Sequence, residues 1–404
     1  MNKFLRFTNI NKDIEGAIKQ IDYPERVNHI LEFIKNKQEK ITYFPDTKQY
    51  YINSFFPSFP SLAWNRLVNG FHGIIKCDDR IPIQADIAVT GRCHCNCWHC
   101  FRPKETKQDM DLALIRDLLS RLSKMGTATV GITGGEPMLH KDIVEIIKSI
   151  PDKIQAQLYT TGHSINNEFA KIIKNSNVNR CIISLDHYND KIVNEMRHND
   201  NAFEEVINAI KILRKYNIYI AITLCITENL LNEDDLKCYF KFATNLDINE
   251  IRVIMPIPQG KLEGKDFSHL YANAIKYVRA FKTLNALCVD SPTIVNFCEF
   301  ESPAYMGCNA GANYISINNT GAVTPCVAVP LSFGNIYEQN IEDVFEKMQK
   351  YFPNSGRICY GKIANRVMCK SCIKSSDRPL PIEESLQIAE KCHVSKERAA
   401  FFVV

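Results

Sequence analysis

The sequence predicts an α/β fold, a partial (β/α)6 barrel of the TIM type, with an extension before it and a cysteine-rich region after it. From about residue 82, unbroken apolar runs alternate with amphipathic helical patterns. Cysteines cluster directly after the first of these runs, and cysteines return once the alternation stops. We therefore expect an extension over 1–80, the barrel over 81–288, a smaller cysteine-bearing region over 289–380 and a C-terminal helix over 381–404.

The composition is that of an ordinary globular protein. Among 404 residues, 45% are hydrophobic and 23% are charged, and the formal net charge is +4. No basic block or low-complexity stretch is evident, so we expect no nucleic-acid partner. The first residues, MNKFLRF, lack the apolar core of a signal peptide, and the run Ile218–Ile226 is too short to cross a bilayer. We expect a cytoplasmic protein without a transmembrane segment.

Residues 1–80 are predicted to form a separate leading element. Apolar residues at helical spacing predict a helix over 13–38, and KITYF and YYINSF on either side of PDTKQ predict a β-hairpin. The segment FFPSFPS then breaks regular structure. This element is either a substrate-binding or leader-peptide-binding unit or a packing extension of the barrel.

Six apolar runs are predicted as parallel strands that are buried on both faces. They cover Ile83–Val89, Ala128–Ile132, Ala156–Tyr159, Arg180–Leu185, Ile218–Ile226 and Ile251–Met255. Amphipathic helices separate them, most clearly at 112–122 and 203–213. Because barrels of this type carry their chemistry at the carboxyl ends of the strands, we expect the functional residues directly after these runs.

Three cysteines with the spacing C-x3-C-x2-C follow the first predicted strand. Sixteen cysteines in the chain already favour metal or redox chemistry over disulfides in a reducing compartment. Cys93, Cys97 and Cys100 can each bind one iron of a 4Fe-4S cluster and leave the fourth iron without a protein ligand. Such an iron can chelate the amino and carboxylate groups of S-adenosylmethionine (SAM).

Zinc is the alternative metal for this loop. C-x2-C is half of many zinc sites, and His94, Cys95 and His99 are close in sequence. A zinc ribbon needs a second C-x2-C roughly 15 to 20 residues downstream. The sequence has none there, which favours the iron–sulfur interpretation and leaves Cys95 as a bystander.

The segment TGGEP follows the second predicted strand. Gly134 and Gly135 allow backbone carbonyl groups to approach a ligand closely, and Glu136 can accept a hydrogen bond from an ammonium group. A Gly-Gly pair is by itself usually only a turn. Here it follows the cysteine loop by one β/α unit and is expected at the same end of the barrel.

The cysteine loop and GGEP together resemble the radical SAM superfamily, over roughly residues 82–285. The resemblance implies that the two glycines and Glu136 bind the SAM amino group. It also implies that Ser184 and Asp186, in ISLD, contact the ribose or nearby groups, and that Arg197, in NEMRH, pairs with the SAM carboxylate. The alternatives are a capping role for Ser184 and Asp186 and a surface position for Arg197.

A second group of cysteines lies in the C-terminal region. Its members are Cys308, Cys326, Cys369 and Cys372. Four thiolates could bind all four irons of a 4Fe-4S cluster and leave no iron open, or they could bind a zinc ion. Their spacing alone does not distinguish these two metal sites. The segment CNAGANYISINNTGAVTPC resembles the SPASM and Twitch auxiliary-cluster extensions. Because the further cysteines of a full SPASM pattern are lacking, we expect one auxiliary 4Fe-4S cluster. Cys298, Cys359 and Cys392 remain unassigned.

The resemblance implies an oxidoreductase or maturase that reductively cleaves SAM to a 5′-deoxyadenosyl radical and abstracts a substrate hydrogen atom. A reductant such as flavodoxin or ferredoxin is expected. The expected substrate is a ribosomally synthesised peptide that is oxidised or cross-linked. The alternatives are dehydrogenation, epimerisation or carbon–carbon bond formation on a small molecule, sugar or lipid.

Two further points bear on function. Sulfatase-maturing members have a carboxylate where Val327 stands, which disfavours that activity. A non-catalytic iron–sulfur, zinc-binding or electron-transfer protein is the alternative of another class. The sequence assigns no catalytic acid, base or hydrogen donor.

Overall fold

The computed structural model describes most of the 404 residues. The described residues are 3–6, 29–30, 32, 40–76, 80–102, 106–286, 288, 290–371, 378–394 and 397–403. Residues 29, 30 and 32 are helical and fall within the helix predicted over 13–38, most of which lies outside the described residues. Cys372 also lies outside them.

One large sheet contains all six predicted strands. Its ten strands follow the order β10-β9-β8-β7-β6-β5-β4-β11-β12-β13. The six predicted strands form β4 (Gln84–Thr90), β5 (Thr129–Gly134), β6 (Gln155–Thr160), β7 (Val178–Ser184), β8 (Tyr219–Cys225) and β9 (Glu250–Ile254). Neighbouring members of this set pair in parallel. The predicted partial barrel is confirmed, because uninterrupted apolar strands are what a sheet covered on both faces requires.

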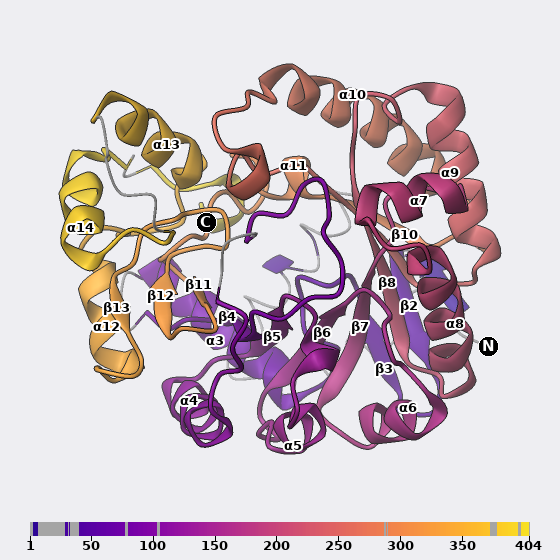
Figure 1. The fold of residues 1–404 in the computed structure, drawn as a ribbon, viewed down its shortest axis with the longest axis horizontal. Coiled ribbons are helices and arrows are strands. Elements are labelled where there is room, and N and C mark those ends of the chain that lie inside the picture. The colour runs from indigo at the N-terminus through magenta and orange to yellow at the C-terminus, as the bar shows by residue number, and fades with distance from the viewer. Residues whose placement is uncertain are drawn as a thin grey trace.

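Seven helices of the barrel region lie along the outer side of this sheet (Figure 1). They are α4 (Leu112–Met125), α5 (Ile143–Lys148), α6 (Asn167–Lys174), α7 (Asp190–Arg197), α8 (Ala202–Lys215), α9 (Glu233–Asn245) and α10 (Ser268–Asn285). In α4, the Asp111 carboxylate caps the first turn and Gly126, with φ 99°, ends the helix. No helix among the described residues is both long and apolar enough to cross a membrane.

The C-terminal region extends the barrel sheet at both edges. β10 (Thr293–Asn296) pairs in parallel with β9, and β11 (Tyr314–Ile317) pairs in parallel with β4. β12 (Ala322–Thr324) and β13 (Gly334–Asn335) then continue the sheet in antiparallel pairing. These strands have four residues or fewer, too short for a hydrophobic pattern to reveal them.

Three helices of the C-terminal region, α12 (Ile341–Gln349), α13 (Tyr360–Lys370) and α14 (Ile382–Lys391), lie on the side of β11, β12 and β13 (Figure 1). The short helix α11 (Phe297–Phe300) packs on β9 and β10 at the opposite edge of the sheet, and the 3-10 turn η4 (Ala400–Phe402) packs on the N-terminal extension. The helix predicted over 381–404 was therefore too long. The chain leaves helical geometry after Lys391, and the apolar pair Phe401 and Phe402 packs against Phe71 in the N-terminal extension.

The N-terminal extension packs against the barrel strands. The predicted hairpin is confirmed as β2 (Lys40–Phe44) and β3 (Gln49–Tyr51), and β1 (Lys3–Arg6) adds a third antiparallel strand. A further helix, α3 (Leu62–Lys76), was not predicted. The loop between β3 and α3 makes hydrogen bonds to strand residues: Ser54 Oγ donates to Glu250 Oε1 at 2.6 Å, and Arg180 donates to Asn53 O at 3.0 Å. The described part of the extension thus acts as packing for the barrel.

Candidate cofactor site

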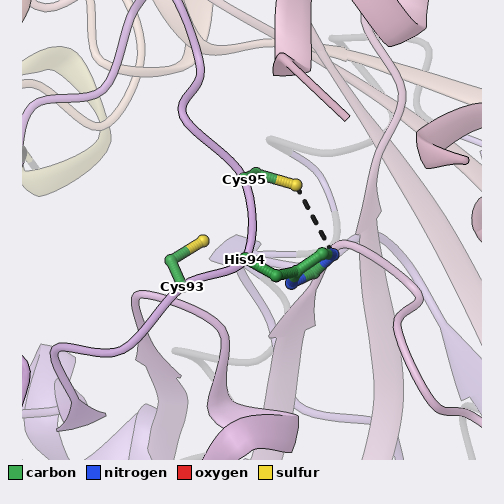
Figure 2. Close-up of side chains that lie close together, drawn as sticks. All are labelled: Cys93, His94 and Cys95. Atoms are coloured by element: carbon green, nitrogen blue, oxygen red, sulfur yellow. Dashed lines mark hydrogen bonds between the residues drawn. The ribbon is translucent and has the colours of Figure 1, made fainter. Parts of the chain in front are cut away.

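The three predicted cluster cysteines lie on one loop that begins where β4 ends. Cys93 is exposed, and Cys97 and Cys100 are half-buried. The Cys95 thiol lies among them: it contacts the sulfur atoms of Cys93 and Cys97. It also lies 3.5 Å from His94 Nε2 (Figure 2). The position of the Cys95 thiol does not distinguish it from the other three thiols of the loop. Only the C-x3-C-x2-C spacing leaves Cys95 outside the predicted set of cluster ligands.

Backbone hydrogen bonds hold this loop against two other elements. Asn96 N and Trp98 N donate to the carbonyl oxygens of the last two residues of α7, at 2.9 and 3.0 Å. On the other side, Lys261 N in η3 (Gly260–Leu262) donates to Cys100 O at 3.0 Å. The loop is therefore fixed at three points between α7 and η3.

The Gly-Gly-Glu segment lies directly against the start of the cysteine loop. Gly135 N donates to Thr90 O and Glu136 N donates to Arg92 O, both at 2.8 Å. A Cβ atom on Gly134, whose φ is 149°, would lie 2.3 Å from Thr90 O, and one on Gly135 would lie 2.2 Å from Arg92 O. Both glycines are needed for this close backbone approach. The structure thus brings the two predicted motifs together.

The Glu136 side chain is completely buried and uses both of its oxygens. Oε1 accepts from Thr160 Oγ1 at 2.7 Å and from Met138 N at 3.1 Å. Oε2 accepts from Thr161 N at 2.7 Å and from Thr161 Oγ1 at 2.8 Å. Burial nevertheless raises the pKa of Glu136. A carboxylate has about four acceptor positions, so Glu136 fixes the ends of β5 and β6 rather than offering an open acceptor to an ammonium group.

The structure also brings Asp186 and Arg197 to the cysteine loop. Arg197 forms an ion pair with Asp186 and donates to Cys97 Sγ at 3.4 Å. The second oxygen of Asp186 accepts from Cys225 N at 3.0 Å. Ser184 ends β7 and is half-buried. The predicted surface alternative for Arg197 is wrong, because the residue is buried.

Two titratable groups of the loop have shifted pKa values. Contact with the Cys95 thiol, aided by the charge of Arg197, lowers the pKa of Cys97 to about 6. Burial lowers the pKa of His99 to about 4, so this imidazole stays neutral near pH 7. A thiolate at Cys97 is the form that binds iron.

Other polar contacts at this end of the barrel were not predicted from the sequence. Arg92 forms an ion pair with Asp109 at 2.6 Å. The Glu205 carboxylate contacts His94 Nε2 and His163 Nδ1, each at 3.0 Å. These partners are distant in sequence, so no local spacing could reveal them. They support the cysteine loop from its outer side.

The structure brings two of the predicted auxiliary cysteines together with one unassigned cysteine. The Cys308 thiol contacts the Cys359 sulfur, and this contact lowers the pKa of Cys359 to about 6. Cys326 lies near both of them. Cys369 is exposed in the last turn of α13.

Further residues lie near the thiols. Cys225, at the end of β8, lies near Asp186 and Cys97, and its backbone N–H donates to Asp186 at 3.0 Å. Tyr271 of α10 lies near Cys225, Cys298 and Cys359. Glu301 is an exposed residue, but neighbouring protein, with a further contribution from Cys359, raises the pKa of its carboxyl group to about 8.

The residues present fit iron–sulfur clusters at both places. Thiolate sulfur is the ligand that such clusters require, and hydrogen bonds to the sulfur atoms tune them. Arg197 supplies such a bond to Cys97. In the C-terminal group, Tyr360 N donates to Cys308 Sγ and Ala328 N donates to Cys326 Sγ, both at 3.4 Å.

Comparisons with known proteins agree with this geometry. The radical SAM superfamily model matches residues 87–237, and the SPASM iron–sulfur cluster-binding domain model matches residues 308–373. An AdoMet-dependent heme synthase from Nitratidesulfovibrio vulgaris is 25% identical over 310 residues, which cover 69% of this chain and 83% of that protein.

Two solved structures share the fold. Streptococcus suis SuiB bound to its precursor peptide SuiA has a TM-score of 0.55 at 18% identity, covering 70% of this chain and 69% of that one. anSMEcpe with bound AdoMet and the Cp18Cys peptide has a TM-score of 0.55 at 18% identity, covering 76% and 95%.

The chain belongs to the radical SAM superfamily. It is an enzyme that carries a SPASM-type C-terminal domain, so its cofactors are SAM and 4Fe-4S clusters. The zinc and non-catalytic alternatives are set aside by this assignment.

Proposed function

We propose that this enzyme cleaves SAM reductively to a 5′-deoxyadenosyl radical, abstracts a hydrogen atom from a ribosomally synthesised peptide, and oxidises or cross-links that peptide. The observation that carries the proposal is the contact of the cysteine loop with the Gly-Gly-Glu segment, together with the second group of thiols at Cys308, Cys326 and Cys359. When bound, the clusters would supply the electron for SAM cleavage and a path for an electron from the substrate.

We assign separate roles to the residues at the SAM end. Cys93, Cys97 and Cys100 hold the cluster, and the backbone carbonyl groups of Gly134 and Gly135, next to the cysteine loop, are candidates to accept hydrogen bonds from the SAM amino group. Glu136, Asp186 and Arg197 act as positioning residues, because both oxygens of each carboxylate and both terminal nitrogens of Arg197 already contact protein atoms. Arg197 Nε has no partner among the described residues. Ser184, at the end of β7, is a candidate contact for the ribose.

Two solved neighbours with bound peptides support a peptide substrate. The similarity to a heme synthase supports the second candidate, a small-molecule substrate. The described part of the N-terminal extension packs against the barrel, so it adds no separate support for a leader-binding unit.

The test is an anaerobic assay of the reconstituted full chain with SAM and a strong reductant such as dithionite. We expect 5′-deoxyadenosine, and we expect its yield to rise with a short peptide encoded beside the gene. Mass spectrometry should then show that the peptide has lost hydrogen. Product without any response to such peptides, but with a response to a tetrapyrrole or other small molecule, would favour the second candidate.

A further inference from the structure

Cys359 is held beside the auxiliary cysteines by the backbone around it. Cys308 N donates to Gly356 O at 2.8 Å, and Gly356 N donates to Cys308 O at 2.9 Å. Next to this pair, Ser355 Oγ donates to Asn309 Oδ1 at 2.7 Å. These bonds tie the segment that leads into Cys359 to the segment that carries Cys308. The contact between the two sulfur atoms follows from this pairing.

The first turn of α13 fixes the same cysteine from the other side. Cys359 directly precedes α13, and Tyr360 N donates to Cys308 Sγ at 3.4 Å. A Cβ atom on Gly361 would lie 3.1 Å from Ala328 O, so this turn packs closely against the loop that follows Cys326. The first turn of α13 therefore lies in contact with both auxiliary segments.

A third contact ties this turn to the barrel. Lys362 Nζ lies 4.2 Å from the centre of the Tyr271 ring, on α10. Tyr271 lies near Cys359 and Cys298, and also near Cys225 at the end of β8. The first turn of α13 therefore contacts a helix of the barrel.

Cys369 lies at the opposite end of α13 from Cys359, which caps the start of this helix. Cys369 lies ten positions after Cys359, which corresponds to about 15 Å along the helix axis. Cys369 is exposed, whereas Cys359 is half-buried among other thiols. The sulfur atoms bound by one 4Fe-4S cluster must surround a compact core, and Cys369 is too far along the helix to join Cys308 and Cys326 while Cys359 does.

We propose that Cys359 binds the auxiliary cluster together with Cys308 and Cys326, in place of Cys369. The fold supports this ligand set because the backbone pairs Cys308 with the segment before Cys359, and the first turn of α13 packs on the loop after Cys326. The assignment does not depend on the substrate proposed above, since it is tested by the metal content of the protein.

The test uses the full chain with Cys93, Cys97 and Cys100 all replaced by alanine, so that only the auxiliary cluster can form. Cys359→Ala, Cys369→Ala and Cys392→Ala are each added to this background. Cys392 is the matched control, because it is buried in the same region and contacts Tyr360. After anaerobic reconstitution, iron and sulfide per chain and the electron paramagnetic resonance spectrum of the reduced protein are measured.

We expect Cys359→Ala to lose more than half of the iron and the spectrum of the background protein, while Cys369→Ala and Cys392→Ala keep both. Retention of iron and an unchanged spectrum in Cys359→Ala would overturn the proposal, as would loss of the iron in Cys369→Ala. If Cys359→Ala does not fold, as judged by circular dichroism, Cys359→Ser takes its place. An altered spectrum of the serine variant then supports the assignment, and an unaltered one overturns it.

Discussion

Arg197 and Asp186 form an ion pair that is almost completely buried beside Cys97. Their side chains are 8% and 1% exposed. Arg197 also donates to the sulfur of Cys97, and the backbone of Cys225 donates to Asp186. One arginine thus compensates a buried carboxylate and contacts the sulfur of Cys97, so we expect it to stabilise both the fold and the cysteine loop.

Replacing Arg197 by alanine should destabilise the protein strongly, because it leaves Asp186 charged and unpaired in the interior. We expect a loss of about 3 kcal/mol in the free energy of unfolding, measured by urea denaturation of the cluster-free protein. The control is Arg214→Ala, which breaks an exposed pair with Asp247 whose side chains are 44% and 69% exposed. That variant should lose less than about 1 kcal/mol. Equal losses in the two variants would contradict the structural role of the buried pair.

Replacing Gly135 by alanine should displace the cysteine loop. The added Cβ atom would lie 2.2 Å from Arg92 O, which is a backbone atom that cannot move without moving Cys93. Because small misplacements at a reacting centre can lower rates by about 100-fold, we expect a drop of this order in SAM-dependent 5′-deoxyadenosine formation. Gly356→Ala is the control, since its nearest contact would be at 3.6 Å. Activity near that of the unmodified protein in Gly135→Ala would show that the loop adapts.

Replacing Glu136 by glutamine distinguishes a positioning role from direct contact with SAM. The amide group would place a donor against the donors that now bind the carboxylate. We expect the free energy of unfolding of the cluster-free protein to fall by about 1–3 kcal/mol. Thermal unfolding in the absence of SAM measures this loss. Glu145→Gln, at an exposed position in α5, serves as the control. Unchanged stability together with weaker SAM binding would instead indicate direct contact between Glu136 and SAM.

These side-chain arrangements mark the limit of what the sequence could predict. The six barrel strands were found because each is an apolar run buried on both faces, and that pattern is local. The cysteine spacing and the Gly-Gly pair are local too, and the structure confirms that the two segments lie together. By contrast, the four hydrogen bonds of Glu136 come from β6 and η2 (Pro137–Leu139), so its lack of an open acceptor depends on the tertiary fold.

In the C-terminal region, too, the contact between cysteines depends on the tertiary fold. Cys308 and Cys359 meet through a backbone pairing at Gly356 that leaves no periodic signal, whereas the adjacent spacing of Cys369 and Cys372 is visible at once. The helix predicted over 381–404 ended early because Phe401 and Phe402 gain more from burial against Phe71 than from continuing a helix. Tertiary packing overrode local propensity there.

The pH dependence of stability tests the environment of Glu301. Glu301 is an exposed residue, but neighbouring protein atoms and the Cys359 thiol raise the pKa of its carboxyl group to about 8. A carboxyl group with a pKa raised in the folded state favours folding when protonated. Its contribution is therefore complete below the pKa of the unfolded chain, about 4.5, and is lost as the pH rises towards about 8.

The cluster-free protein should accordingly lose stability between pH 5 and pH 8.5, and part of this loss should disappear in Glu301→Gln, which cannot ionise. Melting temperatures at several pH values in this range measure the effect. The matched control is Glu383→Gln, at an exposed position in α14, which should follow the unmodified protein at every pH. If the melting temperature of Glu301→Gln changes with pH as that of the control does, ionisation of Glu301 does not lower the stability of the folded protein. Glu301 would then carry a charge near Cys359 at neutral pH.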